Sequence, residues 1–105
     1  MRDATALILL VDDEAKSRET VRYFLQNQGH RTLEASGGEE ALDLIRKDLP
    51  DLVLLDIEME GINGFEVVKR LKDDNRTRPI PVIMITGLAD RASRLRALEN
   101  GAEDY

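Results

Sequence analysis

The stretch "LVLLD" at residues 52–56 is a run of four apolar residues that ends in an acid. A strand covered by helices on both faces has this pattern, because neither of its faces meets solvent. Two further runs share the pattern, "ALILLV" at 6–11 and "IPVIMIT" at 80–86. The three runs predict parallel strands in a sheet that is buried on both faces.

Helical patterns separate these strands. The segment 15–28 places Val21 and Leu25 on one helical face, and Gly29 is a natural helix stop. A short strand, "RTLEA" at 31–35, follows. The chain therefore begins in the order strand, helix, strand.

A second helix is predicted after this strand, because Ser36 and Glu39 have the spacing of a capping box. Its apolar residues keep helical spacing as far as Leu49, and Pro50 closes it.

A third helix is predicted to begin at Asn63, whose side chain is suited to capping, with Glu66 three residues later. A last helix is predicted between Asp90 and Gly101, and residues 102–105 then begin a further strand. The alternation predicts a doubly wound α/β fold with a parallel sheet, in a single domain spanning residues 1–105. Its binding site is expected at the carboxyl ends of the central strands.

The composition narrows the function. Asp and Glu number 21 against 15 Lys and Arg, a net charge of −6, which argues against direct nucleic-acid binding. The absence of cysteine excludes disulfides and thiolate metal sites. No apolar run is long enough to span a membrane, so we expect a cytoplasmic protein without membrane contact.

Polar residues end the three apolar strands. Asp12 and Asp13 follow the first, Asp56 ends the second, and Thr86 ends the third. Acids that precede a helix often only cap it and favour its dipole, which is the simpler interpretation of Asp12, Asp13 and Glu14. Asp56 is harder to explain in this way, because it follows four apolar residues with no basic residue nearby in sequence.

A divalent cation would account for acids on neighbouring strand ends. At 5 Å and an effective dielectric of 20, each pair of carboxylates costs roughly 3 kcal/mol. Oxygen ligands without His or Cys favour Mg²⁺. Mg²⁺ beside a strand-end carboxylate predicts phosphoryl transfer, with Asp56 as nucleophile and the Thr86 hydroxyl donating a hydrogen bond to the transferred group.

The sequence closely resembles the receiver domains of two-component response regulators. The similarity rests on "ILLVDDE" (8–14), "DLVLLDIEMEGINGFEVVKRLK" (51–72), "IPVIMITG" (80–87) and "GAEDY" (101–105). The resemblance implies a flavodoxin-like receiver fold with strand order 2-1-3-4-5. It also implies a sensor histidine kinase or a phosphotransfer protein as the phosphoryl donor.

By this resemblance Asp56 is the phosphoacceptor. The metal ligands are then Asp12, Asp13, Asp56 and the Glu58 backbone carbonyl, with Asp13 binding Mg²⁺ directly and Asp12 largely through water. Thr86 binds the phosphoryl group and moves on activation.

Tyr105 is by resemblance the switch aromatic, which swings inward when Thr86 moves. The Glu58 side chain is unusual for the family, and we expect it to alter the lifetime of phosphorylated Asp56.

The family carries a Lys three residues beyond the switch aromatic, then a last helix, and this sequence stops at Tyr105. We therefore expect a receiver domain that is incomplete at its C-terminus. The strand at 80–86 would then lie at the sheet edge and form a homodimer through that edge.

Two other functions compete with a phosphorylated switch. A phosphatase of the haloacid-dehalogenase type would need an Asp where Glu58 stands, and is disfavoured. A receiver-fold module that binds or dimerises without phosphorylation remains open, because the Lys is absent. The chain is in neither case a conventional enzyme. At most it would phosphorylate and dephosphorylate itself at Asp56 with Mg²⁺.

Overall fold

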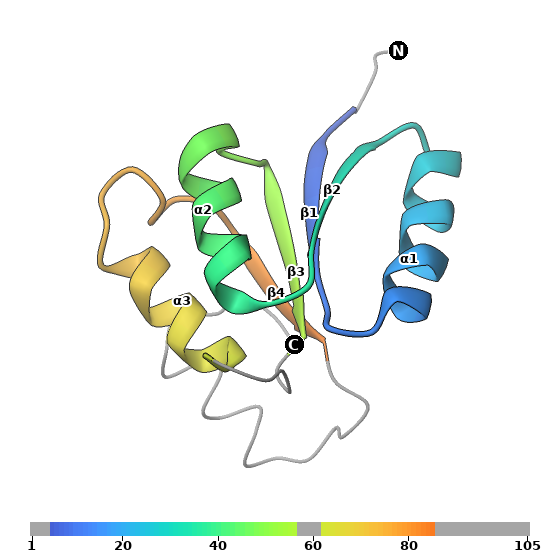
Figure 1. The fold of residues 1–105 in the computed structure, drawn as a ribbon. Coiled ribbons are helices and arrows are strands. Elements are labelled where there is room, and N and C mark those ends of the chain that lie inside the picture. Colours follow the sequence, from blue (N-terminus) through green and yellow to red (C-terminus); the bar gives the residue numbers. More distant parts are fainter. Residues whose placement is uncertain (1–4, 57–61, 86–105) are drawn as a thin grey trace.

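A parallel sheet forms the centre of the computed structural model, which describes residues 5–56 and 62–85. The sheet has four strands in the order β2-β1-β3-β4. The strands are β1 (Leu7–Val11), β2 (Arg31–Ala35), β3 (Leu52–Asp56) and β4 (Val82–Ile85). The helices are α1 (Ala15–Asn27), α2 (Gly38–Asp48) and α3 (Gly64–Lys72). One sheet face packs against α1 and the other carries α2 and α3, so the doubly wound α/β fold is confirmed (Figure 1).

The core lies mainly between the sheet and the pair α2 and α3. Alternate strand residues point to this face because side chains along a strand alternate in direction. The buried residues of this core include Leu9, Val11, Val53, Leu55, Val82 and Met84 from the strands, and Leu42, Ile45, Val68 and Leu71 from the helices. The apolar strand runs recognised in the sequence thus supply one continuous core.

The opposite sheet face is covered less completely. Helix α1 contains no fully buried residue. Its Val21 and Leu25 are half-buried, as the helical pattern predicted, whereas Phe24 and Tyr23 are exposed. Beneath this helix, Ile8 of β1 is nevertheless buried.

Two predicted helix boundaries are confirmed. Gly29 follows α1 with a φ of 90°, in the left-handed region that glycine adopts without steric cost. Asn63 caps α3, and its Oδ1 accepts a hydrogen bond from the Glu66 N–H at 3.0 Å.

The second helix ends before Pro50, as predicted, but its predicted capping box is wrong. The N-cap is Gly37, which makes no side-chain cap, and Ser36 bonds Glu40 through its N–H and hydroxyl instead of pairing with Glu39. Leu49 is not on the apolar face, because it leaves the helix in a left-handed conformation with φ 45° and is exposed.

The third apolar strand was predicted to begin too early. The structure begins β4 at Val82. The Ile80 N–H instead donates to the Thr77 carbonyl in a turn at 3.0 Å. Pro81 has no N–H to give to a sheet, although its carbonyl accepts from the Val53 N–H.

The predicted last helix after Asp90 and the stub at 102–105 lie outside the described residues. Within the described residues, no helix is long and apolar enough to cross a membrane.

Candidate functional site

The carboxyl ends of β1 and β3 bring two acids together. The strands are parallel neighbours, and Val11 lies opposite Leu55 in their register. The next residue on each strand end is an acid, Asp12 after β1 and Asp56 as the last residue of β3. Residues 44 positions apart in sequence therefore become neighbours, in the strand order that the resemblance to receiver domains implied.

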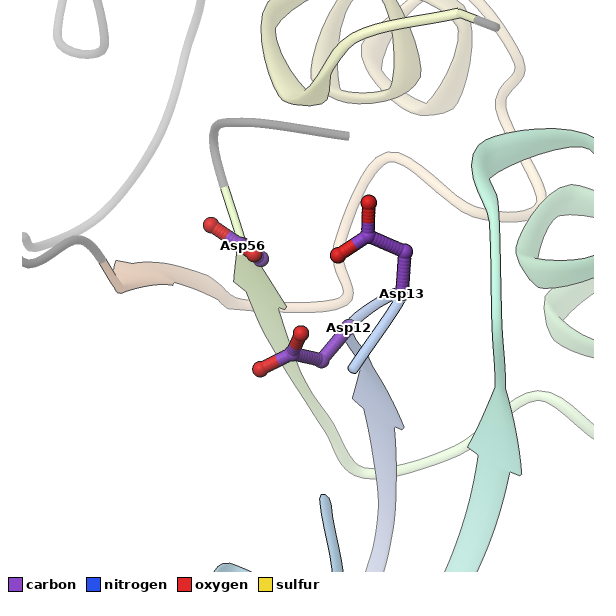
Figure 2. Close-up of side chains that lie close together, drawn as sticks. All are labelled: Asp12, Asp13 and Asp56. Atoms are coloured by element: carbon purple, nitrogen blue, oxygen red, sulfur yellow. The ribbon is translucent and has the colours of Figure 1, made fainter. Parts of the chain in front are cut away.

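Asp13 completes a cluster of three carboxylates with Asp12 and Asp56 (Figure 2). One oxygen from each of the three side chains lies within 4.8 Å of the other two. Asp12 and Asp56 are partly buried, whereas Asp13 is exposed. The cluster is thus open to solvent on the Asp13 side.

The turn that carries Asp12 is held by hydrogen bonds from three directions. Its N–H donates to the Ala35 carbonyl at the end of β2 at 3.1 Å. Its Oδ1 accepts from the Glu14 N–H at 2.9 Å, and its carbonyl accepts from Arg18 Nη1 at 2.5 Å. The backbone of Asp12 is therefore held by β2 and by the Arg18 side chain, and its carboxylate is held by the Glu14 N–H.

The simpler interpretation of these acids as helix caps does not describe the structure. The N-cap of α1 is Glu14, and this residue makes no side-chain cap bond. Its carboxylate instead accepts from the Ser17 hydroxyl. Asp12 and Asp13 precede this N-cap residue, and Asp12 Oδ1 accepts a hydrogen bond from its N–H, so Asp13 and Asp56 are the members of the cluster that no cap accounts for.

An ion-pair network beside the cluster was missed by the sequence interpretation. Glu34 of β2 pairs with Arg22 Nη1 at 2.7 Å and with Arg18 Nε at 3.0 Å. The hydrogen bond from Arg22, supported by the one from Arg18, lowers the pKa of the Glu34 carboxyl below its ordinary value. The signal available in the sequence was Glu34 itself, a charged residue inside the predicted strand 31–35, where a basic partner is to be expected.

The cluster fits a small, hard cation. All its donors are carboxylate oxygens, which Mg²⁺ prefers, and one oxygen from each side chain lies within 4.8 Å of the other two. Among the described residues, neither Asp12 nor Asp13 forms an ion pair with a basic side chain. Their negative charge is therefore available to a metal ion.

The remaining predicted site residues are not placed. Thr86, Glu58 and Tyr105 lie outside the described residues. The register sets Asp56 opposite Ile85, the residue before Thr86 in sequence.

Comparison with known proteins shows the family of this chain. The family model described as the response regulator receiver domain matches residues 8–105. The chain belongs to the response regulator receiver family. This receiver is 41% identical over 98 residues to the phosphate regulon transcriptional regulatory protein PhoB of Escherichia coli. It is 42% identical over 101 residues to the response regulator PleD of Caulobacter vibrioides.

Solved receiver structures share the fold. A putative response regulator from Chloroflexus aurantiacus superposes with a TM-score of 0.92 at 33% identity, over 97% of this chain and 84% of that one. The chemotaxis protein CheY4 of Vibrio cholerae gives a TM-score of 0.91 at 30% identity, over 96% of this chain and 84% of that one.

The curated relatives are longer proteins. The matched region is 93% of this receiver but 43% of PhoB, and 96% of this receiver but 22% of PleD.

Proposed function

We propose that this receiver is the phosphoacceptor of a two-component phosphorelay, with Asp56 as its nucleophile. The observation that supports this role most strongly is the position of Asp56 at the carboxyl end of β3, within 4.8 Å of both Asp12 and Asp13. The phosphoryl donor is a sensor histidine kinase or a phosphotransfer protein, and phosphorylation switches the interaction with a partner.

The reaction converts a carboxylate into an acyl phosphate. An oxygen of Asp56 attacks the phosphorus of a phosphohistidine, forming a P–O bond as the P–N bond breaks. The imidazole nitrogen keeps the electron pair of the broken bond and takes up a proton. Hydrolysis of the acyl phosphate returns the carboxylate, so the receiver is its own substrate.

Mg²⁺ is the cofactor that we propose for this site. Asp13 and Asp56 would hold it directly and Asp12 largely through water, with the Glu58 backbone carbonyl as a further ligand. When bound, the ion offsets the negative charge of the carboxylates and of the incoming phosphoryl oxygens. Asp12 contributes a carboxylate whose orientation is held by a hydrogen bond from the Glu14 N–H.

The roles of three further residues are proposed from the family resemblance. Thr86 donates a hydrogen bond to the phosphoryl group, and Tyr105 moves with it. The Glu58 carboxylate lies two residues after the phosphoacceptor in sequence, and changes the rate at which phosphorylated Asp56 is hydrolysed.

Mass spectrometry after treatment with acetyl phosphate and Mg²⁺ tests the central proposal. We expect the gain of one phosphoryl group, lost in Asp56→Asn and without Mg²⁺. Asp43→Asn is the matched control, because Asp43 is an exposed carboxylate on α2. The absence of any Mg²⁺-dependent mass gain in the wild type would refute phosphorylation and favour a module that binds without it.

We also propose a cytoplasmic homodimer that forms through the edge of β4. In the described sheet, β4 pairs only with β3, and its last residue, Ile85, is 44% exposed. Light scattering at micromolar concentration should give the mass of two chains. Ile85→Lys should shift the distribution toward one chain, and a wild type that is monomeric throughout would exclude the dimer.

A further inference from the structure

Arg18 lies between the acidic cluster and the edge of the sheet. Its Nη1 donates to the Asp12 backbone carbonyl at 2.5 Å, and its Nε donates to Glu34 of β2 at 3.0 Å. The Arg18 side chain is only 17% exposed. One planar guanidinium therefore joins α1, β2 and the turn after β1.

The carbonyl that Arg18 holds belongs to the peptide between Asp12 and Asp13. A peptide is planar, so a donor that fixes its oxygen also fixes the direction in which the next residue leaves. The Asp12 N–H is held independently by the Ala35 carbonyl. Both backbone polar groups of Asp12 are therefore tied to β2, directly or through Arg18 and Glu34.

The ion pair that Arg18 makes among the described residues is with Glu34 and not with a carboxylate of the cluster. Glu34 accepts hydrogen bonds from both Arg18 and Arg22, and it neutralises part of their charge. Arg18 makes no ion pair with the Asp12 or Asp13 carboxylate among the described residues. A guanidinium paired in this way orients the carbonyl and leaves the acids for a cation.

We propose that Arg18 is a positioning residue for the metal site, orienting the Asp12–Asp13 peptide so that the two carboxylates converge with Asp56. This inference rests on the proposed function, in which the cluster binds Mg²⁺. The sign of the change in Mg²⁺ affinity distinguishes a positioning role of Arg18 from a simple effect of its charge. Loss of a nearby positive charge would strengthen cation binding, whereas loss of a positioning contact weakens it.

Calorimetric titration of the intact chain with Mg²⁺ tests the proposal. We expect Arg18→Ala to raise the dissociation constant about tenfold, the lower end of what loss of a partner to a metal ligand costs. Arg18→Lys should behave similarly, because an ammonium keeps the charge but lacks the planar fork that serves two acceptors. The matched control is Arg22→Ala, because Arg22 pairs with the same Glu34 but makes no hydrogen bond or ion pair with Asp12 among the described residues.

Amide exchange without metal supplies the second measurement. The Glu14 N–H, which donates to the Asp12 carboxylate, should exchange faster in Arg18→Ala than in Arg22→Ala. This readout does not depend on phosphorylation or on bound Mg²⁺. If Arg18→Ala fails to fold in a urea titration, Arg18→Lys decides the question by both measurements.

The possible outcomes distinguish failure of the Arg18 positioning role from failure of the proposed Mg²⁺ site. Wild-type Mg²⁺ affinity that is retained or increased in the folded Arg18 variants would overturn the positioning role alone. Equal weakening in Arg22→Ala would overturn it too, because a general loss of the network would then be the cause. A wild type that does not bind Mg²⁺, or that binds it equally after Asp13→Asn, would overturn the proposed metal site itself.

Discussion

Asp13 is the exposed member of three carboxylates that repel one another at one rim of the sheet. The folded state brings these like charges together, whereas the unfolded chain separates them. The cluster therefore costs stability without a cation, and its cost falls when a cation binds. A single substitution that removes the Asp13 charge should raise stability without metal and lower the stabilisation that Mg²⁺ provides.

Thermal unfolding of Asp13→Asn, with and without Mg²⁺, tests both effects. Without metal the variant should melt at a temperature equal to or higher than the wild type, because one repelling charge is gone. With Mg²⁺ at a hundredfold excess over its dissociation constant, the wild type should gain about 2.7 kcal/mol. The variant should gain far less under the same conditions, and Asp43→Asn should match the wild type.

Glu34 provides a second prediction, based on pH. Its pKa in the folded state is lowered by Arg22 and Arg18, so the ionised carboxylate stabilises the fold above the ordinary glutamate pKa. That contribution is lost as the pH falls through the lowered pKa. In urea titrations from about pH 7 to about pH 3, Glu34→Gln should be less stable than wild type at the upper end, and the difference should shrink toward the lower end.

Glu19→Gln is the matched control for this series. Glu19 also pairs with Arg22, at 3.8 Å, but its side chain is 71% exposed. Exposed pairs contribute little, so this variant should follow the wild type at every pH. A difference for Glu34→Gln that is constant with pH would contradict the linkage.

At the level of elements, the start of α2 packs closely against the segment that leads into α3. A Cβ added at Gly38 would lie 2.3 Å from Cγ1 of Ile62 and 2.9 Å from Cγ2 of Val67. Such distances are too short for carbon atoms, so a side chain at this position would push the two helix starts apart. The absence of a side chain at Gly38 is what allows their close approach.

Gly38→Ala should therefore destabilise the receiver by about 1–3 kcal/mol, although alanine favours helices. Gly37→Ala is its control, because a Cβ there meets no atom within 4 Å and its φ of −164° suits any residue. Chemical denaturation compares the two. Stability of Gly38→Ala equal to that of the wild type would show that the helix starts move apart without cost.

For the whole molecule, the apolar patterns in the sequence predicted the strands and helices and hence the class of fold. The runs ending at Val11 and Asp56 predicted the strands, and the resemblance to receiver domains implied the strand order that makes Asp12 and Asp56 neighbours. Local signals were less reliable. Ser36 bonds Glu40 where Glu39 was expected, and Leu49 leaves the helix although its spacing fits.

Arg18 shows why part of the site was beyond sequence reasoning. Its two acceptors, the Asp12 carbonyl and the Glu34 carboxylate, lie 6 and 16 positions away in sequence. A backbone carbonyl leaves no mark in the amino-acid sequence, and a surface arginine on a helix is ordinary. The contact emerges only once α1 is packed against β2.

The pairing of β1 with β3 has a consequence for the order of folding. The chain must first close a loop of more than forty residues before Asp12 and Asp56 become neighbours, a late event when loop closure is costly. A cation that binds only after Asp12 and Asp56 have become neighbours cannot bind the transition state for folding, in which its ligands are still apart. In stopped-flow measurements, Mg²⁺ should therefore slow unfolding and leave the refolding rate nearly unchanged.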